Sequence, residues 1–125
     1  MIALNQRYSY QDICTSMQIL SECYNDFTIC RIVGTSQDDR TIPMMRMGFG
    51  SQNLICTAGI HGRESVNPVL MLRMIEDYAQ GFRFRQSIGG CDVSELLHRY
   101  SICFIPIVNP DGDEIATSGF DVISN

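Results

Sequence analysis

The chain has 125 residues, 45% of them apolar and 18% charged, which is the composition of a globular protein rather than a disordered one. A net charge of −5 and the lack of a basic stripe argue against nucleic acid as a partner. The sequence has no lysine, which excludes P-loop and Schiff-base chemistry here, and no apolar run approaches the ~20 residues that span a bilayer, so we expect no membrane partner.

A helix is the first element that the pattern predicts. Ser9 followed by Asp12 resembles a capping box, with an acid in place of the usual Glu or Gln. Apolar residues then repeat at helical spacing, so we expect an amphipathic helix over about 10–24.

Two strands and a tight turn are expected next. The runs 27–33 and 42–49 are rich in strand-forming residues, and the stretch 34–40 between them has turn composition. The two runs therefore predict a hairpin. Pro43, which cannot donate a ladder hydrogen bond, predicts that the second strand lies at a sheet edge.

Cysteine usage bears on the compartment and on metal binding. No two cysteines have CxxC spacing, which argues against a cysteine zinc site or a thioredoxin-like motif. The N-terminus lacks a basic start followed by an apolar core, so we expect no signal peptide and reduced thiols in a cytoplasmic protein. A disulfide framework is the alternative. The cysteines are Cys14, Cys23, Cys30, Cys56, Cys91 and Cys103.

The middle of the chain predicts a buried strand and a long helix. The almost continuous apolar run 53–60 suits a strand buried on both faces of a mostly parallel sheet. Asn67 and Pro68 form a helix-start signal, with Asn as the cap and Pro as the first helical residue. An apolar face continues to about 80, and Gly81 predicts the helix end.

The last elements complete an α/β pattern. Asp92 predicts the cap of a short helix, and the run 100–108 predicts a second buried strand that ends in the turn sequence of residues 109–112, NPDG. Strand, helix and strand with apolar strands imply a right-handed crossover. We therefore expect one domain over 1–125, of class α/β, with a mixed, largely parallel sheet and helices on both faces.

His61 and Glu64 are the candidate metal ligands. Both follow directly on the carboxyl end of the apolar run, where α/β sheets bind ligands, and their nitrogen and oxygen atoms suit zinc. The HxxE pattern alone is weak, because a polar loop in which His61 forms a hydrogen bond and Glu64 caps the next helix would carry it too.

Four motifs in chain order resemble the zinc carboxypeptidase family. They are YSYQDI with its helix, the hairpin RIVGTSQDDRTIPMMRMG, the loop GIHGRES and the later FIPIVNPDG. Asp39 stands in the hairpin turn where that family commonly has a glycine. The resemblance covers nearly the whole chain and implies the first part of a three-layer catalytic domain.

The resemblance also implies roles for particular residues. His61 and Glu64 would be the first two ligands of a Zn²⁺ ion, and Arg63 would line the substrate cleft. A surface ion pair is the alternative for Arg63. The NPDG turn would be scaffold beside the site, with Asn and Gly supplying special backbone angles. The implied reaction is peptide hydrolysis by zinc-activated water, on peptide ends or on a bacterial cell-wall peptide.

Other parts of the family's site would come later in sequence than NPDG. These parts are a third histidine ligand, a general-base glutamate and a clamp for the substrate carboxylate. We expect His98 to compensate a helix C-terminus rather than bind zinc, and Glu114 matches no family glutamate. A truncated chain of this kind should have little activity alone. The run 100–108 looks like a central strand with few later elements to cover it, so we expect an exposed sheet edge or apolar face that promotes self-association or instability.

Three hypotheses remain open. The chain is part of a zinc metallopeptidase, or a zinc-binding or interaction module of the same fold without turnover, or an α/β domain of unrelated function. In the third, His61 and Glu64 merely pack and cap.

Overall fold

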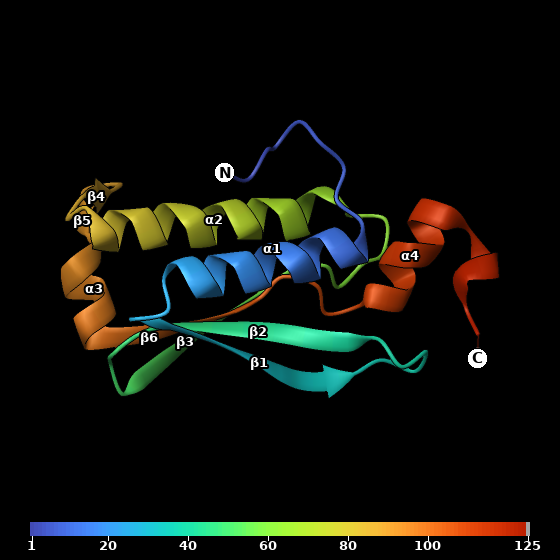
Figure 1. Ribbon diagram of the computed structural model, residues 1–125, viewed down its shortest axis with the longest axis horizontal. Coiled ribbons are helices and arrows are strands. Elements are labelled where there is room, and N and C mark those ends of the chain that lie inside the picture. Colours follow the sequence, from blue (N-terminus) through green and yellow to red (C-terminus); the bar gives the residue numbers. More distant parts are fainter. Residues whose placement is uncertain (125) are drawn as a thin grey trace.

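The computed structural model describes residues 1–124, and in them a mixed sheet is packed against helices (Figure 1). In chain order the helices are α1 (Tyr10–Cys23), α2 (Val66–Arg83), α3 (Val93–Arg99) and α4 (Pro110–Ser118), followed by a 3₁₀ turn (Phe120–Val122). The strands are β1 (Thr28–Thr35), β2 (Thr41–Gly48), β3 (Gln52–Thr57), β4 (Ser87–Ile88), β5 (Cys91–Asp92) and β6 (Tyr100–Ile105). The expected α/β class is thus confirmed.

The main sheet has the strand order β1-β2-β6-β3. β1 and β2 form the predicted hairpin, β2 pairs antiparallel with β6, and β3 pairs parallel with β6. Of the three pairings that the described residues form in this sheet, one is parallel, fewer than the apolar runs predicted. Parallel pairing needs a long crossover, and α2 with α3 supplies it between β3 and β6.

The edge position predicted for β2 is wrong, because β2 lies between β1 and β6. Pro43 is tolerated there for a local reason. Within β2, the residues that pair with β6 are Met45–Gly48, so the Pro43 end of β2 extends beyond β6. On the other side Pro43 faces Ile32, where the register with β1 shifts.

The run 100–108 forms the central buried strand that the sequence predicts: β6 lies between β2 and β3, and four consecutive residues of it, Ser101–Phe104, are buried. The burial on both faces predicted for 53–60 is wrong. β3 forms a sheet edge, and Leu54 and Ile55 are 42% and 69% exposed. An apolar run alone does not reveal whether a neighbour covers it. Self-association through a sheet edge stays a prediction, and β3 is the edge that would carry it.

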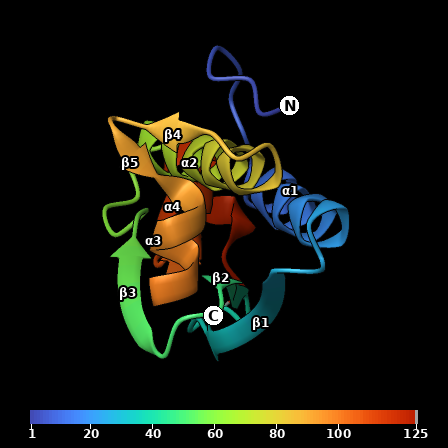
Figure 2. The same ribbon diagram turned by 90° about the vertical axis from the view of Figure 1, so that its left-hand side faces the viewer.

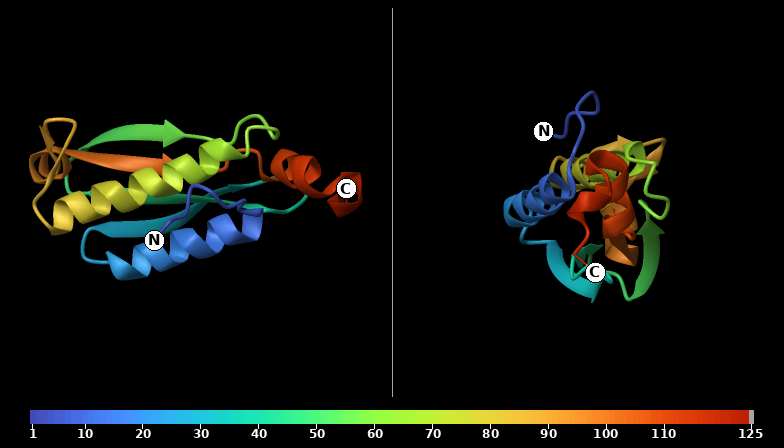
Figure 3. Two further views of the ribbon diagram at one scale, coloured as in Figure 1. Left: turned by 90° about the horizontal axis from the view of Figure 1, so that it is seen from above. Right: turned by 90° about the vertical axis from the view of Figure 1, so that its right-hand side faces the viewer.

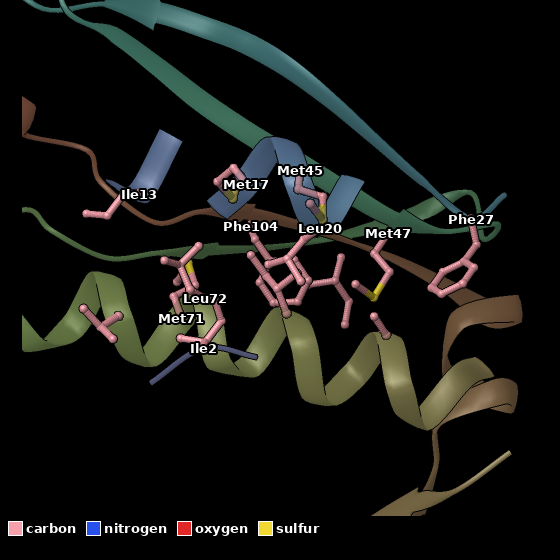
Figure 4. Close-up of a cluster of buried hydrophobic side chains, with 14 of the residues drawn as sticks. Ile2, Ile13, Met17, Leu20, Phe27, Met45, Met47, Met71, Leu72 and Phe104 are labelled. Carbon is pink, nitrogen blue, oxygen red and sulfur yellow. The ribbon is translucent and has the colours of Figure 1, made fainter. Parts of the chain in front are cut away.

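The core lies between the sheet and the helices. Met45 and Met47 of β2 and Phe104 of β6 are fully buried, and they meet side chains of α1 and α2 such as Met17 and Leu72 (Figure 4). Figure 2 shows α1 and α2 on one side of the sheet, whose other side no helix of residues 1–124 covers. Helices on both faces were expected, and the described part supplies one helical layer.

Local capping signals gave good predictions of where helices begin. Ser9 and Asp12 form the expected capping box on α1, and the Asp92 side chain caps α3. α2 begins at Val66, so the predicted cap at Asn67 is wrong: Ser65 is the N-cap residue and its side chain makes no capping hydrogen bond. Gly81 does not end α2 as predicted, because the helix continues to Arg83. An added Cβ at Gly81 would lie 2.9 Å from Val93 Cγ2. A glycine at this point lets α3 pack closely on α2.

The turn between β1 and β2 gives a physical reason for the glycine that the family resemblance implies at position 39. Asp39 has a φ of +61°, in the left-handed region that glycine adopts without strain. Aspartate is among the few other residues that tolerate it.

No helix of residues 1–124 is both long and apolar enough to cross a membrane.

Candidate metal centre

The predicted ligands lie in the loop between β3 and α2, beyond the carboxyl ends of the parallel strands β3 and β6. The loop lies beside α4, as the two views in Figure 3 show. His61, Arg63 and Glu64 are all exposed. Glu64 N–H donates to the His61 carbonyl at 3.0 Å, so the two candidates sit on one tight turn.

The side chains of the three candidates are largely free to bind a ligand. Within residues 1–124 the His61 imidazole and the Arg63 guanidinium make no hydrogen bond or ion pair, so the surface ion pair considered for Arg63 does not form there. Glu64 Oε2 accepts a hydrogen bond from Asn67 Nδ2 at 2.8 Å, next to the start of α2. The other carboxylate oxygen of Glu64 remains available.

Backbone hydrogen bonds continue the parallel ladder past the strand ends and fix the start of this loop. Ala58 N–H donates to Ile105 O, and Val108 N–H donates to Ala58 O, both at 3.0 Å. Asn109 N–H then donates to Gly59 O at 2.8 Å. The segments 58–60 and 105–109 are therefore hydrogen-bonded to each other up to the point where the candidate loop begins.

The NPDG segment is a helix start rather than a free turn, which corrects the sequence prediction. Asn109 caps α4 by accepting a hydrogen bond from Gly112 N–H at 2.9 Å, and Pro110 is the first helical residue. Asn109 Nδ2 also donates to Ile60 O at 3.2 Å. The same Asn-Pro signal was recognised at 67–68 but taken for a turn here, because Gly112 suggested one.

Two glycines meet where the loop touches α4. A Cβ added to Gly62 would lie 2.4 Å from both C and O of Gly112. A Cβ on Gly112 would in turn lie 2.4 Å from Asn109 Nδ2. Neither glycine has a positive φ, so the expected special backbone angles are not the reason for glycine. Close approach is the reason, and it holds the backbone between His61 and Arg63 against the first turn of α4.

Asp111 ties α4 to the β1–β2 turn. Its carboxylate accepts hydrogen bonds from Ser36 Oγ at 2.8 Å, from Asp38 N–H at 3.0 Å and from Arg40 Nη1 at 3.0 Å. Partial burial opposes ionisation of Asp111, but these hydrogen bonds outweigh it and lower its pKa. The sequence showed the turn and the NPDG motif separately and gave no sign that they touch.

Asp113 is a buried acid that sequence reasoning missed. It is 3% exposed, and its Oδ2 has no hydrogen-bond partner among residues 1–124. Burial and, to a smaller extent, the negative charge of Glu114 raise its pKa from 3.8 to about 6, while Arg7 opposes the change. If α4 had been recognised in the sequence, Asp113 would have been expected one helical turn after the cap residue Asn109 and on the same side of the helix.

His98 lies far from the candidate loop along the sheet. It sits in the last turn of α3, as expected, and its Nδ1 lies 2.7 Å from Ser94 O. Its ring stacks at 5.5 Å on Phe49 and lies 5.6 Å from Phe82. These contacts account for His98 without a metal.

The donor chemistry at the loop fits zinc in kind but supplies only two of the usual three protein ligands. In residues 1–124 no three His, Cys, Asp or Glu side chains come together in a metal-binding arrangement. The loop offers one imidazole and one carboxylate with a free oxygen. Whether they bind zinc stays a prediction.

Comparison with known proteins decides the family. The model of the zinc carboxypeptidase family matches residues 13–122. The chain belongs to the zinc carboxypeptidase family. A γ-D-glutamyl-L-diamino acid endopeptidase 1 of Lysinibacillus sphaericus is 25% identical over 114 residues, which cover 91% of this chain. A protein of Arthroderma otae named as inactive metallocarboxypeptidase ECM14 is 27% identical over 106 residues, or 77% of this chain.

Solved structures show the zinc carboxypeptidase fold. Bovine thrombin-activatable fibrinolysis inhibitor, in complex with tick carboxypeptidase inhibitor, matches with a TM-score of 0.75 at 20% identity, over 93% of this chain and 36% of that one. The chain spans 28% of the length of the Lysinibacillus relative and 17% of the Arthroderma one. The resemblance seen in the sequence motifs is therefore confirmed at the level of family and fold.

Proposed function

We propose that this chain supplies the first two zinc ligands, His61 and Glu64, of a metallopeptidase that hydrolyses peptide bonds. The observation that carries the proposal is the loop itself. In a chain of the zinc carboxypeptidase family, both side chains emerge from one tight turn at the carboxyl end of β3 and are exposed. Bound zinc would supply an activated water and polarise the scissile carbonyl.

The chain's own residues would hold the metal and orient the peptide. His61 would bind through a neutral ring nitrogen and Glu64 through the carboxylate oxygen that Asn67 leaves free. Arg63 lies between them in sequence, and its guanidinium has no ion pair within residues 1–124. It is therefore available to donate to a peptide carbonyl or carboxylate at the same edge of the sheet.

For the substrate class we propose γ-D-glutamyl-L-diamino acid peptides, the cell-wall type expected above. The support is the name of the Lysinibacillus relative, which matches 91% of this chain. Turnover of γ-D-glutamyl-diaminopimelate against turnover of an ordinary C-terminal dipeptide would test this choice.

A zinc-binding or interaction module without turnover is the second candidate. Two observations favour it: the Arthroderma relative is named as inactive, and residues 1–124 bring no third ligand to the loop. This candidate shares the metal prediction and differs only in the absence of hydrolysis.

Calorimetric titration with zinc tests the proposal. The background should carry Cys23→Ser and Cys91→Ser, because these exposed thiols could bind zinc on their own. We expect His61→Ala and Glu64→Ala each to weaken zinc binding by more than about tenfold, since each removes one of two ligands. His98→Ala is the matched control and should leave binding unchanged. Equal binding by all four proteins would contradict the proposal and favour an unrelated α/β function.

A further inference from the structure

The NPDG segment contacts two parts of the chain that are distant in sequence. On one side lies the β1–β2 turn at 36–40, and on the other lies the loop that carries His61 and Glu64. Both contacts come from consecutive residues of the same helical turn. A displacement of this helical turn would therefore change its contacts with both the β1–β2 turn and the loop.

The contact with the β1–β2 turn is a network centred on the Asp111 carboxylate. Besides its bond to Asp111, Arg40 Nη1 lies 2.6 Å from Asp38 Oδ2, and Arg40 Nη2 donates to Val122 O at 2.9 Å. Ser36 Oγ, which donates to Asp111, also accepts from Arg40 N–H at 2.9 Å. Charge-assisted bonds of this kind are the stronger class of hydrogen bond. Asp111 is therefore held in a fixed place by the hairpin.

The contact between the NPDG segment and the loop is a close van der Waals contact between two backbones. Gly62 meets the backbone of Gly112 so closely that not even a Cβ fits between them. Asn109 adds its two bonds to Gly59 O and Ile60 O. Gly112 directly follows Asp111 in the chain. The position of the Asp111 carboxylate therefore determines the position of the Gly112 backbone, which Gly62 contacts.

We propose that Asp111 is a positioning residue, which transmits the rigidity of the β1–β2 hairpin through Gly112 and Gly62 to the turn that presents His61 and Glu64. The alternative is a purely local role in which Asp111 stabilises the N-terminus of α4. The geometry disfavours that role, because Asn109 provides the cap of α4 while the Asp111 carboxylate is occupied by the hairpin. As far as zinc is concerned, the inference rests on the proposed function.

Asp111→Asn is the test variant, because it keeps the shape of the side chain and removes its charge. Tyr10→Phe is the matched control. The Tyr10 hydroxyl donates to Thr41 O at 2.7 Å, so its loss loosens the same hairpin from α1 without touching NPDG. The readout is amide hydrogen exchange of the metal-free chain at Glu64, whose N–H bonds to His61 O, and at Asn109, whose N–H bonds to Gly59 O.

We expect Asp111→Asn to speed exchange at both amides roughly tenfold, the scale of one charge-assisted hydrogen bond. Tyr10→Phe should leave them unchanged. Ser36→Ala removes a single bond to Asp111 and should act in the same direction with a smaller change, so the test survives if Asp111→Asn fails to fold. Unchanged exchange at Glu64 in Asp111→Asn and Ser36→Ala, or an equal change in Tyr10→Phe, would overturn the inference.

Zinc titration of the same variants separates this inference from the proposed function. If the wild-type chain binds zinc, Asp111→Asn should bind it roughly tenfold more weakly, as loss of an outer-shell support does. If the wild-type chain binds none, the proposed function fails, and the exchange data still decide whether Asp111 positions the loop.

Discussion

Replacing Gly62 with alanine should destabilise the fold by about 3 kcal/mol and abolish zinc binding at the loop. The added Cβ would lie 2.4 Å from the carbonyl carbon and oxygen of Gly112, and backbone atoms cannot rotate away as a side chain can. The loop would have to move off α4, and His61 and Arg63, which flank Gly62, would move with it. Urea unfolding and zinc titration measure the two effects.

Gly34→Ala is the matched control for this substitution. Gly34 lies in β1, its φ is not positive, and the nearest atom to an added Cβ, Ile42 Cδ1, is at an ordinary 3.7 Å. We expect a change within about 0.5 kcal/mol and unaltered zinc binding. Should Gly62→Ala behave like Gly34→Ala, the close contact between the loop and α4 would be disproved.

Asp113→Asn should remove a pH-dependent loss of stability. Burial raises the pKa of Asp113 from 3.8 to about 6, so the unfolded chain gives up this proton before the folded chain does. The group therefore costs nothing below about pH 4, destabilises the fold progressively as the pH rises to about 6, and has its full effect above that. A shift of this size corresponds to about 3 kcal/mol at pH 7.

Urea midpoints of the wild type and Asp113→Asn from pH 4 to pH 8 test this linkage. The difference in unfolding free energy should move in favour of the variant as the pH rises and level off above about pH 6. Asp111, whose pKa is lowered, acts in the opposite sense and loses its contribution only in more acid solution, so it cancels in the difference. Glu22→Gln on the exposed face of α1 controls for the loss of one charge. Parallel curves for wild type and Asp113→Asn would show that Asp113 is not buried as described.

Predictions were correct for two helix caps and for the hairpin turn, where the stabilising interactions join residues a few positions apart in the sequence. The capping box at Ser9 and the cap at Asp92 satisfy amide groups a few residues away, so sequence alone located both helix starts. The hairpin turn was predictable for the same reason, although the positive φ of Asp39 was not predicted and is known only from the structure.

Burial and sheet order depend on partners far along the chain, and there the predictions held only in part: β6 is central and buried as expected, but β2 is not an edge and β3 is not buried. The run at β3 is as apolar as that at β6, yet β6 has a neighbour on each side and β3 has one. Pro43 suggested an edge because the sequence does not show that β6 stops short of it.

At the candidate site the sequence identified the loop and its motif but not what supports them. HxxE after an apolar strand is a contiguous signal, and so is NPDG. The contact of Gly62 with Gly112 and the bonds of Asp111 to the hairpin join residues 50 and more than 70 positions apart. Such pairs cannot be recognised in the sequence, because they depend on how the strands are arranged in the folded sheet.

The central claim is that His61 and Glu64 bind one zinc ion, and zinc K-edge X-ray absorption of the chain loaded with one equivalent tests it most directly. The account predicts an imidazole nitrogen at about 2.0–2.1 Å and carboxylate oxygen at about 2.0–2.2 Å, with the imidazole signal lost in His61→Ala. A first shell of sulfur at about 2.3 Å that persists in His61→Ala would place the metal on the free cysteines and contradict it.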